Sequence, residues 1–141
     1  MISVVINNNN NENLGITLNN LCKTQKSVLD KIHVIVMNST TDVDISDTIE
    51  KYGKNIDVTV ECQSYDNQWE IQNSILKKVK TPYVAFADSG VEYAKNIFKY
   101  IFEYMGKNDD KFVSLGLFTE DVEFDKSAKE CKNIETVVRL N

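Results

Sequence analysis

The chain has 141 residues and a formal net charge of −5, with 42% hydrophobic and 26% charged residues. This length suits a single domain that buries its own core, so folding requires neither a metal nor a disulfide. The excess of acidic residues argues against a nucleic-acid partner, because nucleic-acid binders present a basic face. No apolar run approaches the roughly 18 residues of a membrane span, so no membrane span is expected.

The amino-terminal residues show neither the basic region nor the long apolar region of a signal peptide, and a cytoplasmic location is therefore predicted. Three widely spaced cysteines, Cys22, Cys62 and Cys131, form no CxxC pair, and His33 is the only histidine. A structural zinc site needs about four such ligands close together. The cysteines are expected to be free thiols that fill space, and His33 is expected to be structural.

The chain begins with the apolar run 2–6, which predicts a strand buried on both faces. Five asparagines at 7–11 predict a loop, because asparagine favours turns. A helix is expected next, with Asn13 as its cap. Its apolar residues recur at a spacing of three or four, as Leu14, Leu18 and Leu21.

Residues 32–37 predict a second strand. A short helix is expected after it, capped by Asp44 or Ser46 and ending near Gly53. The run 56–60 predicts a third strand.

Residues 67–80 predict a helix that Pro82 prevents from continuing, and Trp69 is expected to pack at its start. The run 83–87 predicts a fourth strand. A long helix is expected from beyond Gly90 to about Met105. The residues expected on its inner face are Ile97, Ile101 and Tyr104.

Two further strands are predicted over 112–118 and 136–140, with an acidic loop at 120–125 and a helical turn at 127–132 between them. Strands and helices alternate along most of the chain, which predicts an α/β fold with a mostly parallel sheet and helices on both faces. Ligands of such sheets bind at the carboxyl ends of the strands. The loops expected there are 7–13, 38–42, 62–67 and 88–92.

Motifs on these elements occur in an order that resembles family 2 glycosyltransferases, which have the GT-A (Rossmann-like) fold of the nucleotide-diphospho-sugar transferase superfamily. Residues 34–42 stand where that family has two valines, two aspartates and then Gly-Ser-Thr-Asp, and 71–73 stand at its Ala-Arg-Asn. The run 81–90 matches the strand that ends in the family's metal-binding DxD motif. The spacing of the motifs holds from residue 2 to about residue 105.

The resemblance implies that residues 1–141 form one GT-A-like domain, the nucleotide-binding half of a bacterial enzyme that transfers a sugar from a nucleotide-diphosphate donor to an acceptor hydroxyl. It implies a nucleotide sugar as partner and leaves the acceptor unknown. It places Asp88 on a divalent metal, Mg²⁺ or Mn²⁺, whose oxygen ligands carboxylates supply. The residues that it places toward the nucleotide are Asn8, Asn38, Asp42 and Asn73.

The chain departs from the family at most of these positions. Gly90 replaces the second DxD aspartate, Met37 and Asn38 replace the aspartate pair, and Gln72 replaces the arginine. Asp88 alone also suits a helix cap, and Asn38 and Asp42 equally suit turns. No general base is assigned. The acidic residues nearest to such a position are Glu120, Asp121 and Glu123.

The resemblance to glycosyltransferases leaves two interpretations open, and an α/β domain of another kind also stays open, on fold analogy alone. The chain is either the donor half of a glycosyltransferase, active when further chain or a partner completes it, or an inactive GT-A module with an interaction or scaffold role. The aromatic residues near the fourth helix predict, in part, an interface with a companion domain or a second copy. These residues are Tyr93, Phe98, Tyr100, Phe102 and Tyr104.

Overall fold

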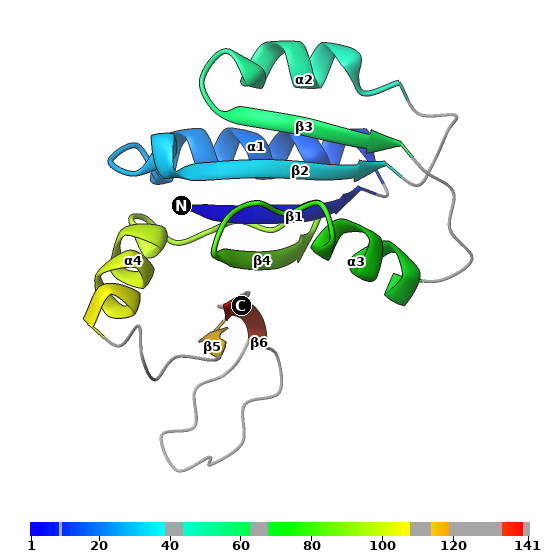
Figure 1. Ribbon diagram of the computed structural model, residues 1–141. Helices are drawn as coiled ribbons and strands as arrows, with labels where there is room; N and C mark the ends of the chain where they lie inside the picture. The colour runs from blue at the N-terminus through cyan, green and yellow to red at the C-terminus, as the bar shows by residue number, and fades with distance from the viewer. Residues whose placement is uncertain (9, 39–43, 63–67, 108–113, 119–133, 140–141) are drawn as a thin grey trace.

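The computed structural model describes residues 1–8, 10–38, 44–62, 68–107, 114–118 and 134–139, and these form one sheet with helices packed on it (Figure 1). The strands are β1 (Ile2–Asn8), β2 (Ile32–Asn38), β3 (Asp57–Cys62), β4 (Tyr83–Asp88), β5 (Ser114–Phe118) and β6 (Ile134–Arg139). The helices are α1 (Asn11–Thr24), α2 (Ser46–Gly53), α3 (Gln68–Leu76) and α4 (Ile97–Lys107), with a short 3₁₀ turn, η1 (Leu29–Lys31).

The order of strands in the sheet is β3-β2-β1-β4-β6-β5. The pairs β2–β3, β1–β2 and β1–β4 are parallel, whereas β6 runs antiparallel to both β4 and β5. The predicted α/β fold with a mostly parallel sheet is therefore confirmed. The chain adds β2 and β3 on one side of β1 and β4 on its other side, so the strand order reverses between β1 and β4 (Figure 1).

Helices α1, α2 and α4 pack on one face of the sheet. The predicted helical face of α1 is confirmed, because all three of its leucines are fully buried. They meet the inward residues of β1 and β2, which alternate along each strand as buried strands require. The buried residues of this face include Ile2, Val4, Ile6, Leu14, Leu18, Leu21, Val34, Val36, Phe98 and Ile101.

Helix α3 packs on the opposite face of the sheet, where Ile75 contacts a smaller cluster formed by Val5, Ile35, Met37 and Val84. The prediction of helices on both faces is therefore confirmed. Among the described helices, none is long and apolar enough to cross a membrane.

The start of α1 differs from the prediction. Strand β1 continues to Asn8, and the cap of α1 is Asn10 instead of Asn13. The Asn10 side chain accepts hydrogen bonds from the backbone N–H groups of Glu12 (2.8 Å) and Asn13 (3.3 Å). A cap residue with an extended backbone and a side-chain oxygen satisfies N–H groups that the helix leaves open, and Asn10 meets both conditions.

Asp44 supports the start of α2, as one of the two predicted caps. Its carboxylate Oδ1 accepts a hydrogen bond from the Ser46 backbone N–H at 2.9 Å, although Ile45 occupies the cap position itself. Hydrogen bonds from the Ser46 side chain and backbone lower the pKa of the exposed Asp44 carboxyl.

The later helices are shorter than predicted. Helix α3 ends at Leu76 and not at 80, and directly after it the Lys78 N–H donates to the Ile75 carbonyl at 2.8 Å, which is the tighter bonding of a final turn. Pro82 therefore lies beyond a helix that has already ended. Helix α4 begins only at Ile97, because Asn96 has a φ of 62°, which breaks a right-handed helix.

The inner face of α4 is also different from the prediction. Tyr104 was expected inside, but 49% of it is exposed, as is 59% of Tyr100. Phe98 lies inside instead, together with Ile101 and Met105. The fully buried residues of α4 are therefore Phe98, Ile101 and Met105, while Ile97, which was also expected inside, is partly buried against the same core.

Several predictions fall outside the described residues. They concern the acidic loop at 120–125 with Glu120, Asp121 and Glu123, the helical turn at 127–132, Cys131, and Asp42. The predicted strands over 112–118 and 136–140 correspond to β5 and β6.

Burial makes Cys22 a weak nucleophile. Its side chain packs against the core on α1, and this desolvation raises the pKa of the thiol, whereas Cys62 is exposed. At about pH 8, Ellman's reagent is therefore expected to label Cys62 before Cys22, since the thiolate is the reactive form. The contribution of Cys22 to stability is constant below the ordinary thiol pKa and falls as the pH rises through the raised value.

The labelling is best measured in a Cys131→Ser background, which leaves Cys22 and Cys62 as the reacting thiols. Equal rates for the two thiols under native conditions would contradict this placement of Cys22. Denaturant provides the control, because both thiols should then react at similar rates.

Candidate functional site

The polar residues at the carboxyl ends of β1 and β4 lie side by side, where the strand order reverses. Asn7 and Asp88 are register partners across the β1–β4 pair. The Asn7 amide Nδ2 donates a hydrogen bond to Asp88 Oδ1 at 3.2 Å. Asp88 is exposed, so its carboxylate can also accept hydrogen bonds from a ligand.

A second pair of bonded side chains, in this case two amides, joins the ends of β1 and β2. Asn8 and Asn38 are register partners, and Asn8 Nδ2 donates to Asn38 Oδ1 at 3.0 Å. Asn8 is fully buried and Asn38 is 5% exposed. Asn8 Oδ1 also accepts the Asn10 backbone N–H at 3.3 Å, so this buried amide joins the two strands to the start of α1.

The structure brings together three of the residues predicted from the sequence. Asn8, Asn38 and Asp88 lie at one end of three adjacent parallel strands, called here the strand-end edge, with Asn7 as its fourth member. Asn73 lies on α3 and is exposed, and Asp42 is outside the described residues. Their predicted contacts with a nucleotide stay predictions.

Sequence reasoning missed Asn7 and Asn10, because it assigned the whole asparagine run to a loop. The signal was present in the alternation of β1. Continued beyond Ile6, it places Asn8 on the buried face and Asn7 on the face of Val5. The spacing of three residues between Asn10 and Asn13 also fits a helix start that the Asn10 side chain caps better than it fits an unstructured loop.

The beginning of α1 is tied to its neighbours by asparagine side chains. Asn11 Nδ2 donates to the Asp44 carbonyl at 3.2 Å, and Asn11 Oδ1 accepts the Thr48 hydroxyl at 2.9 Å. A helix start next to a strand end suits an anion. Here the N–H groups of Glu12 and Asn13 already bond to Asn10, so the strand-end edge offers mainly side-chain amides and one carboxylate.

The turn after β4 is held by backbone hydrogen bonds on both sides. The Ser89 N–H donates to the Asn7 carbonyl at 3.0 Å, and the Gly90 N–H donates to the buried Thr17 hydroxyl at 2.9 Å. Gly90 has a φ of +100°, which side chains rarely adopt. This turn therefore requires glycine at position 90.

Replacing Gly90 with alanine is expected to lower the free energy of unfolding by about 1–2 kcal/mol, through backbone strain. Steric crowding does not cause the expected loss of stability, since the nearest atom to an added Cβ would be Asn13 Cγ at 3.6 Å. Gly15→Ala is the matched control. Gly15 lies within α1 with nothing within 4 Å of an added Cβ, so alanine should stabilise the protein by up to about 1 kcal/mol.

Urea unfolding of both variants measures this difference. A Gly90→Ala protein as stable as the unchanged chain would contradict the strained conformation of the turn.

The described residues do not fit a divalent cation at this edge. Asp88 bonds to the neutral amide of Asn7, and Gly90 contributes no oxygen from a side chain. Glu92 Oε2 instead accepts a hydrogen bond from Asn20 Nδ2 on α1 at 3.4 Å. Within the part of the chain that the structure describes, no three His, Cys, Asp or Glu residues come close enough to hold a metal. The assignment of Asp88 to a metal stays a prediction.

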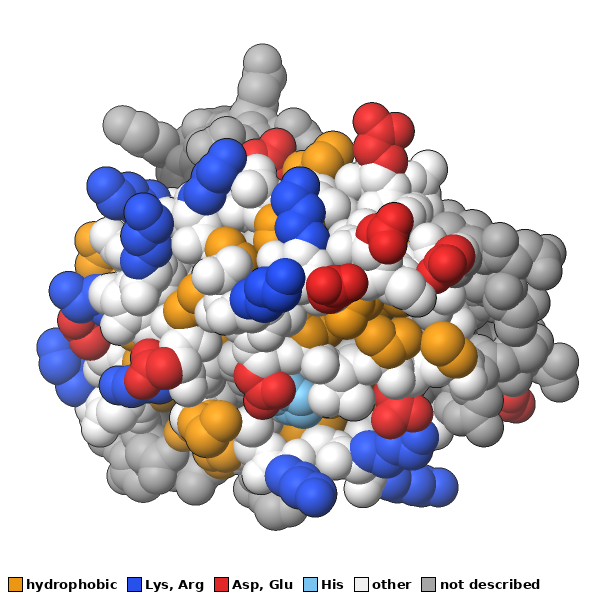
Figure 2. All heavy atoms as spheres, turned by 90° about the horizontal axis from the view of Figure 1, so that it is seen from above, with side chains coloured by type: hydrophobic (Ala, Val, Ile, Leu, Met, Phe, Trp, Pro, Cys, Tyr) orange, Lys and Arg blue, Asp and Glu red, His pale blue; other side chains and the backbone are white. Residues whose placement is uncertain are grey.

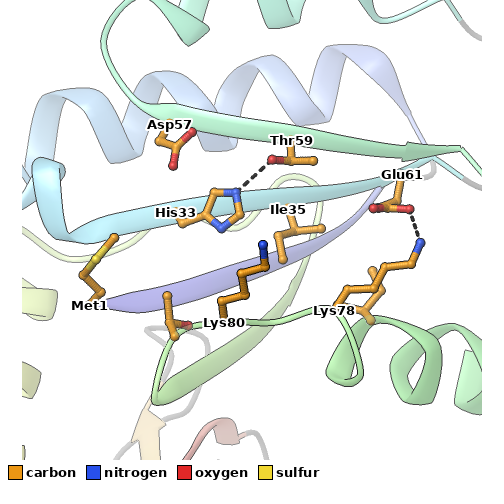
Figure 3. A pocket seen from close by; sticks show the side chains of 10 residues that line it. Met1, His33, Ile35, Asp57, Thr59, Glu61, Lys78 and Lys80 are labelled. Carbon is orange, nitrogen blue, oxygen red and sulfur yellow. Dashed lines mark hydrogen bonds and ion pairs between the residues drawn. The ribbon is translucent and has the colours of Figure 1, made fainter.

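A separate pocket of about 430 Å³ lies on the α3 face, between β2, β3 and the segment after α3 (Figure 3). Its polar groups are already paired in part, since His33 Nε2 bonds to Thr59 Oγ1 at 2.9 Å and Lys78 forms an ion pair with Glu61. Figure 2 shows the histidine (pale blue) at the surface among side chains of both charges. Of the residues predicted to bind a nucleotide, the three that the structure describes, Asn8, Asn38 and Asn73, do not line this pocket.

Comparison with solved structures identifies the fold. The structure of S. aureus TarS 1–349 superimposes with a TM-score of 0.75 over 98% of this chain and 46% of TarS, at 18% identity. TarS 1–349 in complex with UDP-GlcNAc gives a TM-score of 0.67 over 77% of this chain and 32% of TarS, at 21% identity.

The mannosyltransferase PcManGT from Pyrobaculum calidifontis, in complex with GDP-Man and Mn²⁺, gives a TM-score of 0.58 at 15% identity. That match covers 67% of this chain and 29% of PcManGT. No family model and no curated protein matches the sequence. The chain spans less than half the length of each of these structures, and over that span it has the fold of GT-A glycosyltransferases.

Proposed function

We propose that the chain is the donor-binding module of a glycosyltransferase and that it binds a nucleoside diphosphate sugar at the strand-end edge. The observation that carries this proposal is two pairs of bonded side chains on three adjacent parallel strands, Asn7 with Asp88 and Asn8 with Asn38. They lie where the strand order reverses, which is the usual ligand position in such sheets. The fold shared with proteins that bind UDP-GlcNAc or GDP-Man supports the same reading.

Asp88, the exposed carboxylate of this edge, is suited to hydrogen bonding with a sugar or ribose. An ionised carboxylate is an acceptor only, so Asp88 can take hydrogen bonds from ligand hydroxyls, and such charge-assisted bonds are the stronger kind. Asn38 is nearly buried and is proposed to act mainly by fixing the edge on which the nucleoside rests. Asp42 and Asn73 are also proposed to contact the nucleotide.

The proposal covers donor binding, and sugar transfer is assigned to a longer chain or a partner. The TarS and PcManGT structures extend well beyond the part that this chain matches. We propose that the acceptor site and the general base belong to such a further part.

Calorimetric titration with UDP, GDP and CDP tests donor binding. One of the three is expected to bind, and Asp88→Ala is expected to weaken that binding by about tenfold, equivalent to about 1.4 kcal/mol. Asp57→Ala is the matched control, because Asp57 is an exposed aspartate that lines the separate pocket.

An equal effect of the two substitutions, or an effect of Asp57→Ala alone, would place the nucleotide elsewhere. No heat with any of the three nucleotides would contradict the donor-binding role and would favour the alternative, a GT-A module with an interaction role.

A further inference from the structure

The carboxylate of the strand-end edge already has a hydrogen-bond partner within the protein. Asp88 Oδ1 accepts the Asn7 amide at 3.2 Å, and the two residues face each other in the register of β1 and β4. An amide nitrogen carries hydrogens and no charge, so it can partner a carboxylate oxygen but cannot bind a metal through that nitrogen. Asn7 therefore occupies one of the two Asp88 oxygens with a neutral donor.

The backbone after β4 disfavours a second carboxylate at position 90. Gly90 has a φ of +100°, and its N–H is fixed to Thr17 on α1. An aspartate there would have to adopt a conformation that residues with a side chain rarely adopt. The backbone geometry of the turn therefore favours glycine at position 90, and glycine has no side-chain oxygen that could bind a metal.

The next acidic residue is held by other contacts. Glu92 Oε2 accepts a hydrogen bond from Asn20 Nδ2, while Asn20 Oδ1 accepts the Tyr93 backbone N–H at 2.8 Å. Asn20 thereby joins the chain at Tyr93 to α1 and also contacts the exposed Glu92 carboxylate. Divalent cations at nucleotide sites bind through one or two protein carboxylates together with phosphate and water oxygens. The described part of this edge offers a single carboxylate, Asp88, and one of its oxygens already accepts the Asn7 amide.

We infer that the strand-end edge takes its nucleotide without a divalent cation. This inference rests on the proposed function. Asp88 then acts as a hydrogen-bond acceptor for hydroxyl groups of the ribose or sugar, and Asn7 holds its carboxylate in place. The ligand class is a nucleoside diphosphate sugar that is recognised through hydroxyl and base groups, with no metal between its phosphates and the protein.

Two measurements test the inference. The first is the electron paramagnetic resonance spectrum of Mn²⁺ titrated with the protein alone, in which bound Mn²⁺ loses the signal of the free ion. We expect the same free-ion signal with the unchanged protein and with Asp88→Asn. A loss of signal that disappears in Asp88→Asn would overturn the inference.

The second measurement repeats the nucleotide titration in EDTA and in excess Mn²⁺. We expect dissociation constants that agree within about twofold, whereas binding at least about tenfold tighter with Mn²⁺ would overturn the inference and leave donor binding intact. If no nucleotide binds in either buffer, the proposed function fails, and the Mn²⁺ spectrum alone then decides whether the edge holds a cation.

Discussion

Replacing Gln25 with leucine is expected to lower the free energy of unfolding by about 3 kcal/mol. Gln25 is fully buried directly after α1. Its Oε1 accepts the Phe98 backbone N–H at 3.1 Å, and its Nε2 donates to the Ala94 carbonyl at 2.8 Å. One side chain therefore joins the end of α1 to the start of α4.

Leucine has a similar size but no hydrogen-bonding group, so the buried Phe98 N–H would lose its partner. A buried donor without a partner costs about 1–3 kcal/mol, and the lost bond to Ala94 adds about 1 kcal/mol. The Ala94 carbonyl keeps a second hydrogen bond from the Ile97 N–H at 3.2 Å, which limits the total.

Urea unfolding measures the effect, with Asn19→Ala as the control. Asn19 is a half-buried amide of α1, and alanine there should be neutral or slightly stabilising, because alanine favours helices. A loss below about 1 kcal/mol in Gln25→Leu would show that water or a local shift satisfies the Phe98 N–H.

Replacing Asn8 with alanine is expected to lower the free energy of unfolding by about 2 kcal/mol. The substitution removes the donor to Asn38 Oδ1 and the acceptor of the Asn10 N–H, both at a buried position. It also removes a bond that places the start of α1 beside β1, so nucleotide binding should weaken together with stability.

Asn7→Ala is the matched control for Asn8, since the neighbouring asparagine makes an exposed bond to Asp88. We expect a loss of at most about 1 kcal/mol from it. A double-mutant cycle of Asn8→Ala with Asn38→Ala should give a coupling free energy of about 1 kcal/mol. Equal losses from the Asn7 and Asn8 substitutions would contradict the structural role of the buried pair.

The sequence predicted the fold well because the buried elements carry strong periodic patterns. The β-branched run at the start of β1 and the three leucines of α1 are each consistent with one kind of element, and both were assigned correctly. Errors occurred where local chemistry competes with periodicity. The asparagine run was predicted as a loop, although Asn7 and Asn8 complete a strand and Asn10 caps a helix.

The candidate site could be predicted only in part. The parallel sheet places the ends of β1, β2 and β4 at one edge, so the proximity of Asn8, Asn38 and Asp88 followed from the predicted topology. The partners within the edge did not follow, because register decides that Asn7 faces Asp88 and that Asn8 is buried. The sequence shows that glycine replaces the second DxD aspartate at position 90. It does not show that Gly90 has a positive φ.

Nuclear magnetic resonance of the ¹⁵N-labelled chain, titrated with UDP and then GDP and CDP, shows which residues a nucleotide contacts. We expect the amide signals of Asn7, Asn38 and Asp88 to shift together along one saturating curve. Shifts confined to His33, Thr59 and the other residues of the separate pocket, or no saturable shift with any of the three nucleotides, would contradict a donor site at the strand-end edge.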